Sequence, residues 1–216
     1  INEVLDLSKI ESGNMTISIE EVPLHSLLSE ILELLQPMLN AKKISFNAAP
    51  LETSGITVLA DRVRLKQVLL NLISNAVKYN HPGGSISVAC RKLEDSKIQI
   101  SVQDTGVGIS PENLEKIFNP FHRVESKTEP IEGTGIGLTI TKKLILAMGG
   151  NIGLQSEYGK GSTFWFELEQ IVDGSLGPPG SVTDQQPAVS ADAAIMMVGD
   201  KKLLYIEDNP ASARLM

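Results

Sequence analysis

The feature that most constrains the fold is a helical run from Asp61 to Asn80 that carries two different faces. At about 100° per residue, one face is apolar and consists of Leu65, Leu69, Leu72, Ile73 and Ala76. A second face gathers Asn71, Asn75 and Lys78 within about 60°. Amide oxygens suit a hard cation and an ammonium suits phosphate, so this face fits a metal–phosphate ligand. From these three residues alone, an ordinary solvated helix face is the alternative interpretation.

Strands and further helices are predicted on both sides of this run. Amphipathic spacing predicts helices over 24–40 and 138–148, and Ser110-Pro111-Glu112 begins a short one. Apolar or alternating stretches predict strands over 15–20, 44–48, 56–60, 85–92, 97–104, 151–156 and 162–170. A helix flanked by strand pairs indicates helices on one face of a sheet. We therefore expect a two-layer α/β sandwich, with a mixed sheet of about five strands and three main helices on one face.

The composition narrows the class of protein. A hydrophobic content of 42% in 216 residues is ordinary for a globular core, and the formal charge of -7 argues against a nucleic-acid partner. Cys90 is the single cysteine, which excludes an intrachain disulfide and indicates a reducing compartment. No apolar run approaches the roughly 20 residues of a membrane-spanning helix. We expect a soluble, cytoplasmic chain without membrane contact.

A carboxylate ends one of the predicted strands on the buried side. Ile98, Ile100 and Val102 alternate, and Asp104 continues their parity. A buried charge is costly unless it is hydrogen-bonded, so Asp104 needs donors from its own loop or from a ligand. The alternative is a simple turn at the strand end, capped by Asp104 and followed by Gly106 and Gly108.

A long connection from Thr105 to about Thr134 has the length of a lid or binding loop. Phe118 and Phe121 are candidate anchors for it, and Arg123 is a candidate contact for an anionic ligand. The glycine-rich stretch 133–137 then runs directly into a helix, which leaves backbone N–H groups open to phosphate. A dinucleotide-binding βαβ unit is a poor match, because no strand precedes these glycines.

Four blocks in this order resemble the ATP-binding catalytic domain of sensor histidine kinases, within the superfamily shared with DNA gyrase, the large heat-shock chaperone and mismatch-repair ATPases. The blocks are residues 71–79, 104–108, 118–121 and 133–137, and residues 159–163 trail them. The match covers about residues 15–170. As an ordered set the blocks are specific, whereas each block alone is weak.

The resemblance implies roles for individual residues. Asp104 would accept a hydrogen bond from the adenine amine, Asn75 would ligate Mg²⁺ with Asn71 beside it, and Lys78 would contact phosphate. The remaining implied nucleotide contacts are Tyr79, Gly106, Gly108, Gly133, Gly135, Gly137, Leu138 and Thr163. Arg123 would reach the terminal phosphates from the lid. Asn71, Lys78 and Arg123 would be the catalytic residues.

The resemblance also implies a reaction. Hydrolytic members of the superfamily carry a glutamate where this chain has Asn71, and an amide cannot act as a general base. Transfer of the ATP γ-phosphoryl group to a histidine is therefore favoured over hydrolysis. The alternatives are a hydrolytic ATPase or serine kinase of the same superfamily, and a pseudo-catalytic nucleotide-binding scaffold.

Four segments are expected along the chain. Residues 1–14 resemble the end of a dimerisation and phosphoacceptor helical hairpin, and residues 15–171 the catalytic domain. A Gly- and Pro-rich flexible linker would span 172–199, and 200–216 resemble the start of a receiver domain. The resemblance thus implies an acceptor histidine upstream of Ile1, a receiver domain or response regulator as partner, and a homodimeric full-length protein.

Overall fold

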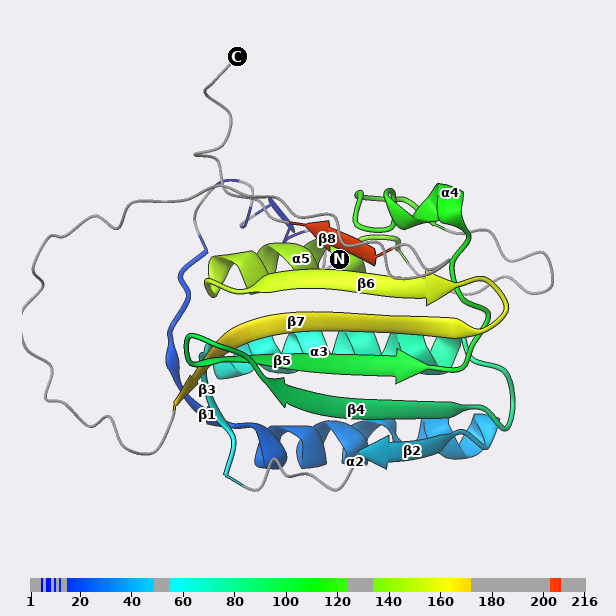
Figure 1. Ribbon diagram of the computed structural model, residues 1–216, viewed down its shortest axis with the longest axis horizontal. Coiled ribbons are helices and arrows are strands. Elements are labelled where there is room, and N and C mark those ends of the chain that lie inside the picture. The colour runs from blue at the N-terminus through cyan, green and yellow to red at the C-terminus, as the bar shows by residue number, and fades with distance from the viewer. Residues whose placement is uncertain are drawn as a thin grey trace, which may run out of the picture.

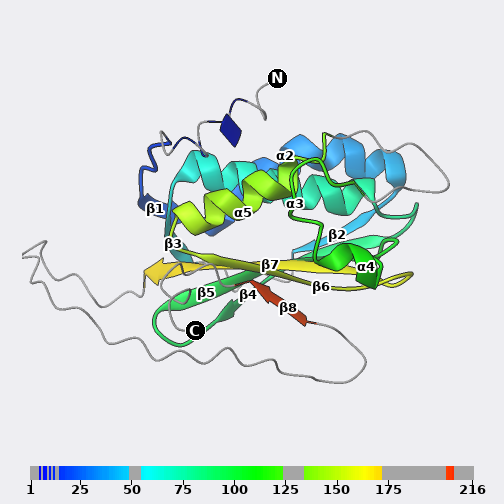
Figure 2. The same ribbon diagram turned by 90° about the horizontal axis from the view of Figure 1, so that it is seen from above.

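The structure, a computed structural model, describes residues 5, 7, 8, 10, 12, 15–48, 55–123, 134–171 and 203–206. Seen from above in Figure 2, these residues form two layers, a sheet and a set of helices that cover one of its faces. The covering helices are α2 (Leu24–Lys42), α3 (Arg62–Lys78) and α5 (Gly137–Ala147). The predicted α/β sandwich with three main helices on one face is confirmed.

Within the described residues the strands form one sheet, ordered around β7 (Gly161–Ile171) (Figure 1). On one side β7 pairs with β5 (Lys97–Asp104), and on the other with β6 (Asn151–Glu157), both antiparallel. Beyond β5 lie β4 (Ser85–Lys92) and then β2 (Ser45–Ala48). The β2–β4 pair is parallel, which makes the sheet mixed as predicted.

The sheet is larger than the five strands expected. Its three additional members are β1 (Glu20–Pro23), β3 (Thr57–Ala60) and β8 (Leu203–Ile206). The first two extend the sheet because β3 pairs with the last residues of β7 and β1 pairs with β3. The third, β8, lies antiparallel along β6.

The core lies between the helices and the sheet and follows the predicted periodicities. On β5, Ile98, Ile100 and Val102 are at most 1% exposed, and the predicted apolar face of α3 is at most 5% exposed, at Leu65, Leu69, Leu72, Ile73 and Ala76. Asp61 caps α3, since its Oδ1 accepts a hydrogen bond from the backbone N–H of Arg64 at 3.0 Å. Asp61 is therefore the N-cap of α3, and α3 itself packs against β5.

The strand predicted over 15–20 is wrong in its position. Residues 15–19 have no regular secondary structure, and β1 begins only at Glu20. The backbone N–H of Ser18 donates to Asp61 Oδ2 at 3.1 Å, so at this point the chain is held by a side chain and not by a neighbouring strand. Met15 and Ile17 still pack against the core, which explains their alternation.

The ends of the chain are described only in part. Leu5, Leu7, Ser8 and Ile10 are helical, and Leu7 is buried in the core. The predicted linker at 172–199 and most of the receiver-like segment at 200–216 lie outside the described residues. In the part of the chain that is described, no helix combines the length and apolar character that a membrane crossing would need.

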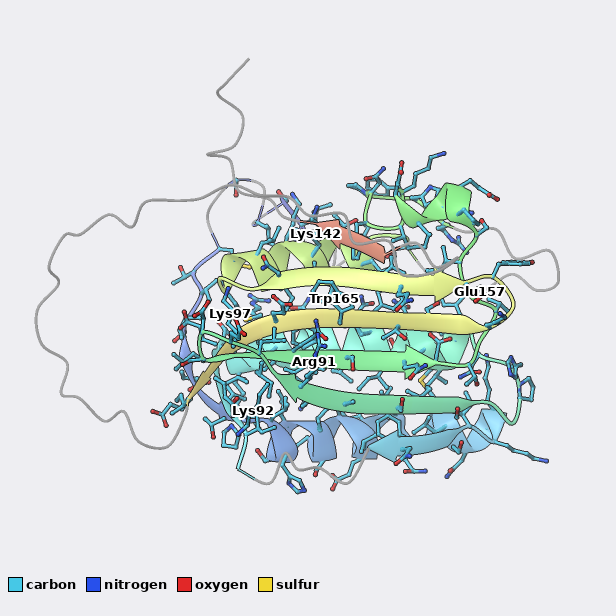
Figure 3. All side chains as sticks on the ribbon, viewed as in Figure 1. Arg91, Lys92, Lys97, Lys142, Glu157 and Trp165 are labelled. Carbon is cyan, nitrogen blue, oxygen red and sulfur yellow. The ribbon has the colours of Figure 1, made fainter. Side chains whose placement is uncertain are left out.

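The sheet face that the helices leave uncovered is largely polar. Figure 3 shows Arg91 and Trp165 on this face. A side-chain ladder crosses it, because Arg91 Nη2 donates to Gln99 Oε1 at 3.2 Å and Gln99 Nε2 donates to Glu167 Oε1 at 3.4 Å. We call this surface the outer face. The candidate functional residues lie mainly on the other side, at the end of the sheet where β5 finishes.

Candidate functional site

Asp104 is the last residue of β5 and is only 7% exposed. Its Oδ1 accepts a hydrogen bond from the backbone N–H of Gly106 at 2.8 Å. Burial raises the pKa of this carboxyl, while the backbone N–H groups of Gly106 and Ser162 and the charge of His81 lower it by smaller amounts. The predicted buried carboxylate is thus present, with a donor from its own loop.

The loop that follows Asp104 is tied to two other elements. The backbone N–H of Val107 donates to Tyr79 O at 3.1 Å, and Val107 O accepts from the Gly159 N–H at 2.7 Å. Gly108 has a φ of 66°, and an added Cβ there would run into the Glu157 carbonyl. The loop therefore requires glycine for close backbone approach.

A partly buried polar cluster of Asn80, Ser85 and Thr105 lies at the start of this loop. Asn80 is 6% exposed, and its Nδ2 donates to Ser85 O at 3.0 Å. Thr105 Oγ1 accepts from the Ser85 N–H at 2.9 Å and lies 3.4 Å from Asn80 Oδ1, to which it donates. Sequence reasoning missed this cluster, because its three members are ordinary polar residues at the ends of elements.

The predicted polar face of α3 exists and touches α5. Asn75 Nδ2 donates to Asn71 Oδ1 at 3.4 Å, and Asn71 Nδ2 donates to Thr141 Oγ1 at 2.8 Å. Both asparagines are half-buried. An added Cβ on Gly137 would meet the Asn71 amide, so the first turn of α5 rests directly on this face.

The last turn of α3 brings the polar face to the Asp104 loop. Lys78 is the final residue of α3 and Tyr79 is its C-cap, and both are half-buried. Tyr79 O is the acceptor for Val107, as described above. Predicted residues from two separate sequence blocks are thus joined by a backbone hydrogen bond.

Residues 118–121 of the predicted lid are held against the segment that begins α5. The backbone N–H of Phe121 donates to Gly135 O at 3.0 Å, and Thr139 Oγ1 donates to Phe118 O at 2.9 Å. Phe118 is buried at 6% exposure, as an anchor should be, whereas Phe121 is 67% exposed. Only the first of the two predicted anchors is therefore part of the core.

The remaining predicted lid residues lie on both sides of residues 124–133, which the structure does not describe. Arg123 is exposed next to Phe121, and Leu138 is half-buried in the first turn of α5. That helix has Ile136 as its N-cap and no side-chain cap bond. Because the first N–H groups of a helix have no intrahelical acceptor, those of α5 can bind an anion. Gly133 lies outside the described residues.

Thr163 is misplaced by one position in the predicted site. The register of β5 and β7 sets Ser162 opposite Asp104 and Thr163 opposite Gln103. Directly opposed residues share a face of the sheet. Ser162, at 7% exposure, therefore lies on the side of Asp104, and Thr163 belongs to the outer face. Alternation along β7 agrees with this, because Phe164 and Phe166 face the core.

The donor set fits a magnesium ion only with help from a ligand. Among the described residues there is no group of three His, Cys, Asp or Glu side chains that could hold a metal. Mg²⁺ is often bound by one or two protein oxygens together with substrate phosphates and water. Asn75 Oδ1 suits this role better than Asn71, whose amide already bonds Thr141 and Asn75.

A family model agrees with this geometry. Residues 60–171 match the family described as histidine kinase-, DNA gyrase B- and HSP90-like ATPases. The matched range contains α3, the Asp104 loop and both glycine-rich segments. The chain belongs to this family, and it carries an ATP-binding catalytic domain of the type found in sensor histidine kinases.

Individual relatives are of the same type. The chain is 39% identical to the sensor histidine kinase GacS of Pseudomonas protegens over 172 residues, which are 78% of this chain and 19% of GacS. Full-length ShkA, solved in complex with AMPPNP, matches with a TM-score of 0.66 at 33% identity, over 78% of this chain and 35% of ShkA. ThkA, solved with the response regulator protein TrrA, matches at 0.57 and 29%, over 77% and 48%. The chain spans about a fifth of the length of GacS.

Proposed function

We propose that this domain binds Mg-ATP with the adenine at Asp104 and the phosphates between α3 and the start of α5. The observation that carries the proposal is the buried Asp104 carboxylate, which keeps acceptor capacity beyond its bond to Gly106. An adenine exocyclic amine is a donor that would meet this need. The neighbouring glycines support the proposal, because they let backbone lie close to a flat base.

The phosphate end would be held by charge and by backbone donors. Lys78 would contact phosphate as a point charge, Arg123 would reach the terminal phosphates, and the open N–H groups at Gly137 and Leu138 would cradle them. When bound, Mg²⁺ would neutralise phosphate charge next to Asn75. All of these groups act by positioning and electrostatics, which dominate phosphoryl transfer.

In the whole protein we infer transfer of the γ-phosphoryl group to a histidine. Two points support transfer over hydrolysis. The relatives are named as histidine kinases, and Asn71 cannot act as the general base that a glutamate at this position would provide. The histidine would belong to a dimerising helical hairpin of the same protein, and a response regulator or receiver domain would be the next acceptor. A cytoplasmic location is part of this proposal, and it is supported by ATP as the substrate and by the single cysteine, Cys90.

The test is calorimetric titration of a non-hydrolysable ATP analogue, with and without Mg²⁺, into this chain and into Asp104→Asn. We expect wild-type binding in the micromolar range and a loss of at least about tenfold in the variant, since a buried amide presents a donor where the base also donates. Glu94→Gln, in the exposed turn between β4 and β5, serves as the matched control and should bind like wild type.

The metal assignment is tested separately with Asn75→Ala and Asn75→Asp. Both variants should change the Mg²⁺ dependence of nucleotide binding. If folded wild-type protein binds no nucleotide, a scaffold role replaces the proposal. If both variants bind nucleotide with the same affinity and the same Mg²⁺ dependence as wild type, the nucleotide site stands and the role of Asn75 is wrong.

A further inference from the structure

Lys42, the last residue of α2, makes contacts that the predicted site does not include. Its Nζ donates to Val77 O at 3.1 Å, to Lys78 O at 2.7 Å and to Asn80 O at 3.3 Å. These acceptors are 35 to 38 residues away along the chain. The ammonium therefore uses its three donors on one short stretch of backbone, the end of α3.

The end of a helix leaves its last carbonyl groups without intrahelical partners. Among the carbonyls of residues 77–80, at the end of α3, Lys42 does not bind that of Tyr79. The Tyr79 carbonyl instead accepts the N–H of Val107. The four consecutive carbonyls of residues 77–80 are thus all occupied, three by Lys42 and one by the Asp104 loop. A cation at this position also interacts favourably with the negative, C-terminal end of the helix dipole.

Lys42 contacts the pair of helices α2 and α3 at a different place from the ion pairs that join them elsewhere. At the far end of α3, Glu30 of α2 already forms ion pairs with Arg62 and with Lys66, the latter at 3.0 Å. That contact joins the two helices away from the site. Lys42 joins them where Lys78 and Tyr79 leave α3.

We propose that Lys42 is a positioning residue for the nucleotide site. It holds the backbone of Lys78, Tyr79 and Asn80 so that the Lys78 side chain faces the phosphates and Tyr79 O stays bonded to the Asp104 loop. This inference rests on the proposed function, because it names the element that orients that site. Lys42 itself touches no nucleotide.

The test compares Lys42→Met with Lys43→Met, which removes the same charge from the neighbouring, exposed residue. Affinity for the ATP analogue is measured on folded protein, well below the melting temperature of each variant. We expect Lys42→Met to weaken binding roughly tenfold, a usual size for coupling between two sites, and Lys43→Met to leave it unchanged. Lys42→Arg, which keeps several donors, should restore most of the affinity. If Lys42→Met does not fold, Lys42→Gln takes its place.

A combined variant tests whether Lys42 acts through Lys78. In a Lys78→Ala background, Lys42→Met should cost less affinity than it does in wild type. Unchanged affinity in Lys42→Met, with or without a lower melting temperature, would overturn the proposal and leave Lys42 as a structural cap. An equal loss in both backgrounds would overturn the route through Lys78.

Hydrogen exchange without nucleotide keeps this inference separate from the proposed function. In Lys42→Met the amides of Tyr79 and Val107 should exchange faster than in wild type, while those near Arg62 should not. If wild type binds no nucleotide, the proposed function fails. Local, faster exchange would then still support Lys42 as the group that positions the end of α3, and unchanged exchange would overturn it.

Discussion

The two sides of the candidate site are held in different ways. One side, which we call the wall and define as residues 104–108 with the end of α3 and the β6–β7 turn, is crossed by hydrogen bonds between three elements. The lid side, defined as residues 111–123 and 134–139, is fixed by two bonds close to α5 and by the anchor Phe118. Backbone bonds from two other elements hold the wall, whereas the lid side relies on one backbone bond and on the side chains of Thr139 and Phe118.

This difference matches the two parts of the proposed ligand. An adenine ring is rigid and needs a preformed slot, so close backbone packing at Gly106 and Gly108 suits it. Phosphates and a metal change geometry during transfer, so groups on a less tightly bonded segment suit them. Substitutions on the wall should therefore affect stability strongly, and substitutions on the lid side should affect it less.

The largest expected effect is on the wall, from Gly108→Ala. The φ of 66° and the encounter with Glu157 should together cost about 2 to 4 kcal/mol of unfolding free energy. Urea denaturation measures this value. Gly159→Ala is the matched control, because it also has a positive φ, 86°, but nothing lies near its added Cβ. It should cost only about 1 kcal/mol. Equal losses would mean that the close approach is not what constrains the wall.

Next in size is Thr139→Val on the lid side. It keeps the shape of the side chain but leaves the Phe118 carbonyl without its donor, at a position that is 4% exposed. The expected cost is about 1 to 2 kcal/mol by the same denaturation measurement. Thr163→Val on the outer face is the control and should change stability little. A loss larger than that of Gly108→Ala would reverse the comparison.

A smaller effect is expected from Asn113→Ala. Asn113 Oδ1 pairs with His122 Nε2 at 3.1 Å, and Asn113 Nδ2 donates to Ser110 Oγ at 2.9 Å. Both bonds are only partly buried, so the cost should be about 0.5 to 1 kcal/mol. Proteolysis of the native protein near Arg123 should become faster in the variant. An unchanged cleavage rate would show that this pair does not hold the lid side.

The smallest effect on stability is expected from Asp104→Asn, although it should abolish tight nucleotide binding. Burial raises the pKa of Asp104 in the folded state, so the native protein binds its proton more tightly than the unfolded chain. The contribution of this group to the free energy of unfolding is therefore fully present at low pH, and it is lost as the pH rises through the raised pKa of the folded state. The variant, which has no such group, should gain stability relative to wild type between pH 4 and pH 7.

The comparison is made by urea unfolding at these two pH values. The Asn side chain can still accept the Gly106 N–H, so the loop should remain intact. A variant that becomes less stable relative to wild type at higher pH would contradict the raised pKa. Glu94→Gln again provides a control for the loss of one negative charge.

Much of the fold follows from local pattern. The strands 85–92 and 97–104 have the predicted bounds, because alternation and a polar turn specify both ends. Asp61 could be predicted as a cap from its type and position alone. The strand at 15–20 could not be placed correctly, since only the absence of a ladder partner distinguishes Ile17 from a strand residue.

The site was predictable only where a residue type is unusual for its place. Asp104 stood out because its parity buries a charge, and the amides of α3 stood out beside an ammonium. Ser162 was missed in favour of Thr163, because a register between distant strands cannot be read from either strand alone. Lys42 gave no signal, since its acceptors are backbone atoms and any sequence supplies those.

The position of β7 has a consequence for how this domain is made. β7 is the strand between β5 and β6, yet it follows both of them along the chain. During synthesis from the N-terminus, β5 and β6 therefore exist before the strand that joins them. Until residue 171 has been added, each has an open edge that can pair with another nascent chain. Rapid synthesis of residues 161–171, or chaperones that cover those edges, would protect the domain at this stage.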